Sequence, residues 1–473
     1  MVFSSLIFLY LFLPACLICC GLSSLIKKSM VPRNLVLIVF SLVFYAWGEP
    51  VYILLLLCSV LVNYLLGLGI GACQSRGKQG GSKALLILGL IYNIGLLGVF
   101  KYSAFVVENL NRIPQVNLPV PHIVLPIGIS FYTFQILSYI IDLHWGKIDV
   151  QKNPLNLLLY ISMFPQLIAG PIVRYSTIAA EIQNRKVTLL DLSEGFTRLS
   201  LGLAKKVILA NNLSTIVDAF FGKGGSISVA GTWYAVIVYA MQIYFDFSGY
   251  SDMAIGMGRM LGFHFNENFR YPFLCKDISE FWQRWHISLG TFFRDYLLYV
   301  PIFGKRRKYG GLFLVWFCTG LWHGASWNFV IWGLYFGLFI FFEQLIGKKN
   351  MKKIPIVIRH IYNKIVIIVG FGIFYFEDLG RLGKFFRDLV GLNGNALIDE
   401  VTKTSMQNNL FLLLAALICC FPLYEGITKL RQKSVGGAYV FGLFQTCCNL
   451  AMFAVSSILL VDATNNPFLY FRF

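Results

Sequence analysis

The chain has 473 residues, of which 57% are hydrophobic and only 13% are charged, whereas a soluble domain carries about 25% charged residues. Its mean hydropathy of +0.68 excludes a water-soluble globular protein. The formal net charge of +18 does not indicate a nucleic-acid partner, because the Lys and Arg residues lie mainly in short segments between apolar runs, as in the cytoplasmic loops of membrane proteins. The composition therefore predicts an all-α polytopic protein surrounded by membrane lipid.

The predicted membrane segments are the apolar runs, and a full span needs about 20 such residues. We expect about 11–13 segments within a single domain that covers residues 1–473. In chain order the runs cover residues 5–26, 34–48, 51–72, 84–106, 124–141, 154–170, 207–221, 228–248, 310–322, 325–347, 354–375, 409–428 and 437–461.

Basic residues between the runs predict the orientation, because short cytoplasmic loops are rich in Lys and Arg. They place 303–309 and 348–353 in the cytoplasm, and 376–406 and the N-terminus on the opposite side. The first run has no preceding basic residue and no cleavage pattern, so it is expected to be a retained span. The residues used are Lys27, Lys28, Arg33, Arg76, Lys78, Lys83, Lys305, Arg306, Arg307, Lys308, Lys348, Lys349, Lys352, Lys353, Lys429, Arg431 and Lys433.

Two stretches do not fit a simple series of spans. Pro165, Gly170 and Pro171 interrupt the run 154–170, and a full crossing there would place the basic stretch 174–206 outside. We therefore predict a re-entrant or amphipathic part near 154–206. Non-helical backbone inside the membrane is tolerated only where protein surrounds it or where it lines a water-filled cavity. Residues 269–300 mix polar and aromatic residues and predict amphipathic helices near the cytoplasmic face.

His323 is the leading catalytic candidate of the six histidines. It follows the apolar run 310–322, which rises about 20 Å as a helix, and precedes an expected helix break at Gly324. It should therefore lie inside the membrane, where an ionisable residue indicates function. Neutral imidazole accepts protons near pH 7, which suits acyl transfer to a hydroxyl. The alternative is a hydrogen-bonded structural histidine.

The remaining candidates are His286, the carboxylates of the stretch 244–263 and several supporting residues. His286 lies among aromatic and charged neighbours, which fits either a site or an interfacial belt. Carboxylates in the apolar stretch 244–263 should pair or line a cavity, and pairing is the simpler role. No Cys/His cluster of the zinc type occurs, and two histidines without a third ligand do not predict a metal site. The supporting candidates are Arg284, Trp285, Trp322, Arg174, Asp246 and Asp252.

Several sequence blocks resemble the bacterial membrane-bound O-acyltransferase (MBOAT) family, in particular its alginate O-acetyltransferase branch. The resemblance covers nearly the whole chain, and its most specific blocks are FWQRWHISL and GLWHGA. The family more often has two arginines before the Trp-His pair, where this chain has Gln283 and Arg284. The blocks include MVFSSLIFLYLFLP (1–14), LPIGISFYTFQILSYIID (125–142), FPQLIAGPIVRY (164–175), DFSGYSDMAIGMGRMLGF (246–263), ENFRYPF (267–273), EFWQRWHISLGTFFRDYL (280–297), GLWHGASWNFVIWG (320–333) and NPFLYFRF (466–473).

The resemblance implies a bowl of tilted and re-entrant helices around a central tunnel in the bacterial plasma membrane. It implies that His323 is catalytic, that His286 supports it, and that no cofactor is bound. The expected reaction moves acetyl from cytosolic acetyl-CoA to an exported or cell-envelope polysaccharide, directly or through an extracytoplasmic SGNH-type partner. One alternative is D-alanyl transfer to teichoic acid from a carrier protein. Another is a non-enzymatic transporter or flippase, because such proteins also contain broken helices and buried charges.

Overall fold

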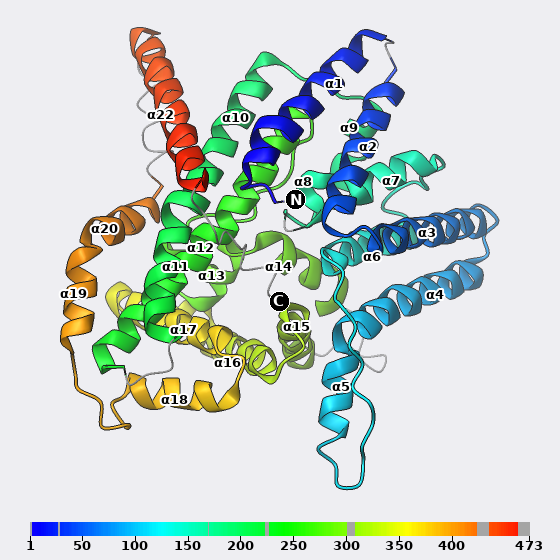
Figure 1. Cartoon of the computed structure of the whole chain (residues 1–473). Helices are drawn as coiled ribbons and strands as arrows, with labels where there is room; N and C mark the ends of the chain where they lie inside the picture. Colours follow the sequence, from blue (N-terminus) through cyan, green and yellow to red (C-terminus); the bar gives the residue numbers. More distant parts are fainter. Residues whose placement is uncertain are drawn as a thin grey trace. The chain divides into compact units, whose positions relative to one another are not determined.

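Helices are the only regular elements in the part of the chain that the computed structural model describes, residues 2–26, 29–168, 170–222, 227–299, 308–422 and 435–461. This confirms the predicted all-α class (Figure 1). The predicted cytoplasmic residues Lys27, Lys28, Lys305, Arg306, Arg307, Lys429, Arg431 and Lys433, and the block at 466–473, lie outside the described residues. The described chain forms two compact units, and the boundary falls within α10 and α12. The single domain and the central tunnel stay predictions.

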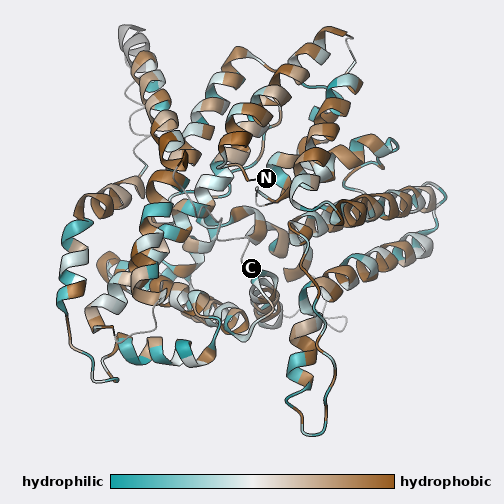
Figure 2. Ribbon diagram, in the orientation of Figure 1, coloured by the Kyte–Doolittle hydropathy of each residue, from teal (hydrophilic) through white to brown (hydrophobic). Residues whose placement is uncertain are grey.

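The first unit comprises Met1–Leu199 and Ser251–Asn266. In it α3 and α4 lie side by side (Figure 1), and Figure 2 shows both as hydrophobic along most of their length. Its elements are η1 (Phe8–Phe12), α1 (Leu13–Ile26), α2 (Val31–Gly48), α3 (Tyr52–Ser75), α4 (Gln79–Leu97), η2 (Gly98–Tyr102), α5 (Ser103–Leu110), α6 (Ile129–His144), α7 (Pro154–Ser162), α8 (Phe164–Leu167), α9 (Tyr175–Gln183) and most of α10 (Leu189–Ala204).

The second unit comprises Ser200–Tyr250 and Glu267–Phe473. Most of α12 belongs to it, and α18 and α19 carry hydrophilic residues (Figure 2). Its elements are η3 (Lys205–Ala210), α11 (Asn211–Val217), η4 (Asp218–Gly222), α12 (Val229–Met260), η5 (Pro272–Leu274), α13 (Ile278–Arg284), α14 (Ile287–Phe293), η6 (Arg294–Leu298), α15 (Lys308–His323), α16 (Trp327–Met351), α17 (Ile356–Tyr375), α18 (Leu379–Leu389), α19 (Glu400–Asn408), α20 (Leu410–Cys419) and α22 (Val435–Val461).

Seven helices among the described residues are long and apolar enough to cross a membrane. The other predicted apolar runs form shorter or more polar helices, and the expected number of 11–13 membrane segments stays a prediction. The seven are Phe8–Ile26, Val31–Gly48, Tyr52–Ser75, Gln79–Leu110, Trp327–Met351, Ile356–Tyr375 and Gly442–Val461.

The run 124–141 differs most from its expectation as a membrane segment. Its helix, α6, begins only at Ile129, because Pro126 and Gly128 precede it and Gly128 adopts φ +79°. A Cβ at Gly128 would lie 2.9 Å from the carbonyl oxygen of Leu167. Of the 16 residues in α6, 14 are buried, so this helix is an interior element of the first unit.

The predicted interruption of 154–170 is confirmed. The helix α7 ends at Ser162, and α8 covers only Phe164–Leu167. The nine residues of α7 rise about 14 Å, less than half of a hydrocarbon core of about 30 Å. The stretch 269–300 likewise forms only short helical elements, η5, α13, α14 and η6.

The glycines in the stretch 244–263 allow close backbone contact and do not interrupt the helix. The helix α12 continues without interruption from Val229 to Met260. In the second unit, a Cβ at Gly249 would lie 2.7 Å from the carbonyl oxygen of Gly202, and in the first unit one at Gly256 would lie 2.6 Å from that of Gly195. The absent side chains let α12 pack directly on α10.

Candidate active site

His323 is the last residue of α15, and its imidazole is enclosed by aromatic rings. The predicted break follows it, since α16 begins at Trp327. His323 is 6% exposed, and its ring centroid lies 5.1 Å from Trp322, 4.9 Å from Trp332 and 5.2 Å from Phe374. A neutral imidazole held in a fixed orientation at a helix break can serve as a base for a group bound beside it.

Two glycines bring α15 and α16 close enough to build this enclosure. A Cβ on Gly333 would overlap the carbonyl oxygen of Trp316 and lie 3.1 Å from Cα of Gly320. A Cβ on Gly320 would overlap the carbonyl oxygen of Phe329. Because neither glycine carries a side chain, the backbones meet, and Trp332 lies against the His323 ring.

His286 lies between α13 and α14, outside the helices long enough to span the membrane. Its backbone is left-handed, with φ +45° and ψ +54°, a conformation that costs a non-glycine residue about 1–3 kcal/mol and clusters at functional sites. Asn268 holds this backbone, since its carbonyl oxygen accepts from the Ile287 N–H at 3.0 Å.

The hydrogen bonds of Asn268 fix the tautomer of His286. Oδ1 of Asn268 accepts from the backbone N–H of Ser288 at 3.1 Å and from its hydroxyl at 2.8 Å, which identifies this atom as the oxygen. Nδ1 of His286 lies 3.2 Å from the same oxygen and must therefore donate a proton to it. Burial lowers the pKa of His286 to about 3, so the ring is neutral at pH 7 and its Nε2 carries a lone pair.

Trp322 connects the two histidines. It is 3% exposed, and its ring centroid lies 5.7 Å from that of His286 and 5.1 Å from that of His323. Phe247 of α12 packs perpendicular to His286 at 4.7 Å. The structure thus brings the three predicted residues His323, His286 and Trp322 into one cluster in the second unit.

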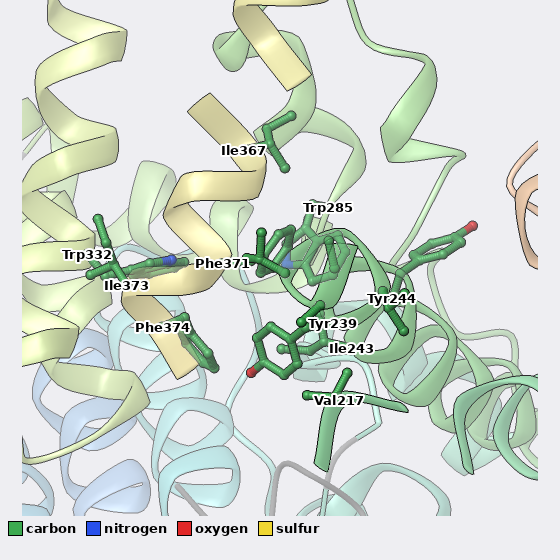
Figure 3. Packing of buried hydrophobic residues seen from close by; sticks show 14 of the residues in the cluster. Val217, Tyr239, Ile243, Tyr244, Trp285, Trp332, Ile367, Phe371, Ile373 and Phe374 are labelled. Atoms are coloured by element: carbon green, nitrogen blue, oxygen red, sulfur yellow. The ribbon is translucent and has the colours of Figure 1, made fainter. Parts of the chain in front are cut away.

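Trp285 packs in the neighbouring hydrophobic core. Its ring lies 5.5 Å from Phe281 and 5.1 Å from Phe371 of α17. Figure 3 shows Trp285 beside Phe371, with Tyr239 and Ile243 of α12 in the same cluster. Because Trp285 directly precedes His286, this packing fixes the backbone on the N-terminal side of His286.

Arg284 lies one residue earlier and remains about one third exposed. Its guanidinium donates to Glu280 at 2.6 Å, one helical turn before it. Its carbonyl oxygen accepts from the Arg270 N–H at 2.9 Å, which ties α13 to the segment that contains Asn268.

The start of α13 is tied to two membrane helices by residues that the sequence analysis did not identify. Glu343 of α16 accepts from the N–H groups of Ile278 and Ser279 at 2.7 and 2.9 Å. Arg359 of α17 pairs with Asp277 at 2.9 Å. A carboxylate at a helix N-terminus is stabilised by the helix dipole, so these contacts anchor the helix that leads to His286.

The two predicted carboxylates form ion pairs. Asp246 lies 2.5 Å from Nζ of Lys206 in the second unit, and both side chains are almost fully buried. Asp252 lies in the first unit, 2.7 Å from the guanidinium of Arg198. Arg174 directly precedes α9 in that unit. The pairing expected for the carboxylates is confirmed, and the roles of these three residues in catalysis or donor binding stay predictions.

Asn268, Lys206 and Trp332 are contacts of the site that sequence analysis did not select. Asn268 and Trp332 lie inside the quoted blocks, but nothing in their local sequence marks them. Lys206 does have a signal, since it is a charge at the edge of an apolar run. Among the described residues, no three His, Cys, Asp or Glu side chains gather as metal ligands would, and the absence of a metal stays a prediction.

Comparison with known proteins gives the family. Residues 148–379, which contain both histidines, match the model of the MBOAT, membrane-bound O-acyltransferase family. The chain is 36% identical to the "probable alginate O-acetylase AlgI" of Pseudomonas putida, over 100% of both chains. It is 33% identical to the peptidoglycan O-acetyltransferase of Helicobacter pylori, over 84% of this chain and 81% of that one.

A more distant relative is the teichoic acid D-alanyltransferase of Bacillus subtilis, 30% identical over 50% of this chain and 64% of that one. The full-length matches, the seven apolar helices and the buried histidine cluster agree with one another. This chain is a multi-pass membrane protein that belongs to the membrane-bound O-acyltransferase family and is an acyltransferase.

Proposed function

We propose that the protein moves acetyl groups from cytosolic acetyl-CoA across the bacterial plasma membrane for the O-acetylation of an exported or cell-envelope polysaccharide. The observation that carries the proposal is the enclosed His323 at the end of α15, joined through Trp322 to a neutral His286. The polysaccharide acceptor is supported by relatives named for alginate and peptidoglycan acetylation.

The proposed reaction is a proton-coupled acyl transfer. His323 takes the proton of an acceptor hydroxyl as the oxygen attacks the carbonyl carbon of the thioester. The carbon–sulfur bond breaks, the new ester bond forms, and the proton passes from His323 to the departing thiolate of coenzyme A. His286 orients the reacting groups through Nε2, because Asn268 holds its Nδ1–H.

The acceptor hydroxyl belongs either to the polysaccharide itself or to an extracytoplasmic SGNH-type partner that passes the acetyl group on. The proposed orientation of the protein in the membrane is the one that the basic loops predict, with the N-terminus and 376–406 extracytoplasmic. D-alanyl transfer is the second candidate, and it is disfavoured because the D-alanyltransferase match covers half of the chain whereas the O-acetylase match covers all of it.

Membrane vesicles of opposite orientation test the donor and the direction together. Inverted vesicles expose the cytoplasmic face to added labelled acetyl-CoA and should form labelled O-acetyl esters on an acceptor inside. Right-side-out vesicles exclude acetyl-CoA and should form none. Transfer from a D-alanyl carrier and not from acetyl-CoA would support the second candidate, and no transfer from either donor would contradict an acyltransferase of this kind.

Arg284 is proposed to bind the phosphates of the donor, since its planar guanidinium forms paired hydrogen bonds with phosphate. Arg284→Lys keeps the charge but loses this geometry. One charge-assisted hydrogen bond is worth about 1.5–3 kcal/mol, so we expect the apparent KM for acetyl-CoA to rise about tenfold or more. Gln283→Ala alters the exposed neighbour and should leave the KM unchanged. An unchanged KM in Arg284→Lys removes the donor-binding role.

A further inference from the structure

One face of α16 contains two buried polar atoms that have no hydrogen-bond partner among the described residues. Asn328 and Trp332 are four residues apart, so they lie on the same side of the helix. They are 0% and 2% exposed. Among the described residues, Oδ1 of Asn328 and Nε1 of Trp332 have no hydrogen-bond partner.

This face is next to His323. The indole of Trp332 lies 4.9 Å from the His323 ring, and the two planes are 79° apart. Phe374 of α17 contacts both rings, at 5.3 and 5.2 Å, and Figure 3 shows Trp332 and Phe374 as neighbours from adjacent helices. The side-chain amide of Asn328 donates to the carbonyl oxygen of Phe374 at 3.3 Å, which holds the end of α17 in place.

A buried donor without a partner is costly, at about 1–3 kcal/mol, and a phenylalanine would fill most of the same volume without that cost. Such groups are uncommon in native proteins and call for a specific explanation. The indole N–H donates and never accepts. Beside the proposed base, it fits an acceptor that the substrate brings. The acceptor that a donor would stabilise most is the thioester carbonyl oxygen, because negative charge develops on it during attack.

We propose that Trp332 is a catalytic residue whose Nε1–H donates a hydrogen bond to the carbonyl oxygen of the acyl group during transfer. The inference rests on the proposed function. As the acceptor hydroxyl bonds to the carbonyl carbon and His323 takes its proton, the carbonyl electrons move to oxygen, where the indole N–H stabilises them. When the carbon–sulfur bond breaks, the carbonyl re-forms and the thiolate leaves with the proton from His323.

Trp332→Phe tests the inference because it removes the N–H and keeps an aromatic ring against His323. Loss of one donor to a developing oxyanion lowers kcat about 10²–10³-fold, and we expect this loss with little change in the KM for acetyl-CoA. Trp282→Phe is the matched control, since Nε1 of Trp282 is also buried and unpartnered among the described residues. Its ring packs on Trp316 and Trp332, so this variant should stay near the wild-type kcat.

A second variant separates the N–H from the shape of the ring. Replacement of Trp332 by 3-benzothienylalanine, introduced through a suppressed stop codon, keeps the bicyclic ring and puts sulfur in place of the N–H. It should lose as much kcat as Trp332→Phe while unfolding at the wild-type temperature in detergent. Near-normal kcat in this variant, or equal losses in Trp332→Phe and Trp282→Phe, would overturn the inference. Failure of the proposed function would be a separate result, namely the absence of acetyl transfer by the wild-type protein.

Discussion

Replacement of His323 by Ala is expected to abolish measurable acyl transfer while the protein still inserts and remains folded in detergent. General acid–base assistance is worth about 10²–10⁴-fold, and no other described imidazole packs on the same three rings. The measurement is transfer of labelled acetyl from acetyl-CoA, with size-exclusion chromatography of the purified variant as the test of folding.

His323→Gln separates catalysis from packing. Glutamine is similar in size and forms hydrogen bonds, but it does not act as a base near neutral pH. We therefore expect this variant to be nearly as inactive as His323→Ala. If His323 only packed between Trp322, Trp332 and Phe374, the His323→Gln variant would keep much of its activity, because glutamine could take over the packing role. Near-normal transfer by a well-expressed His323→Gln protein would remove His323 from the catalytic role.

His286→Ala provides the comparison within the site. Because His286 is neutral and its Nδ1 is bound to Asn268, it orients or polarises the reacting groups and does not carry the proton in transit. It should therefore retain more activity than His323→Ala. The reverse order of activities would exchange the proposed roles of the two histidines.

The second large effect is expected at the ion pair between Asp246 and Lys206, on stability and not on chemistry. The two side chains are 2% and 4% exposed, and their charged atoms are 2.5 Å apart. Removal of one member leaves the other charge buried, which costs about 3–5 kcal/mol. Asp246→Asn should therefore lower the free energy of unfolding by about that amount, as followed by denaturant titration in detergent.

Two variants complete this test. The double change Asp246→Leu with Lys206→Met removes both charges and should regain most of the lost stability, because a buried ion pair is often no better than an apolar pair of similar volume. Asp252→Asn is the matched single change, and it should cost about 0–1 kcal/mol, since its partner Arg198 is one third exposed. A loss of less than about 1 kcal/mol in Asp246→Asn contradicts the assigned structural role.

Local features of the sequence were sufficient for the class and for much of the helix pattern. Hydropathy predicts the membrane helices, and the break at Gly324 leaves His323 at the end of α15 as expected. Pro165, within the run 154–170, similarly predicts the interruption there. These predictions succeeded because backbone geometry and solvent preference act over a few neighbouring residues. The catalytic assignment of His323 came from its motif and its expected depth.

Only the tertiary structure decided which residues meet. Asn268 fixes the tautomer of His286 from 18 residues away, and Lys206 and Asp246 are 40 positions apart, so no local pattern pairs them. Gly320 and Gly333 bring Trp332 onto His323 by removing two side chains between α15 and α16. The burial of α6 is likewise absent from its hydropathy, because an interior helix and a lipid-facing helix are equally apolar. In a membrane protein the apolar pattern specifies that a helix avoids water, and the close packing of particular side chains specifies its neighbours.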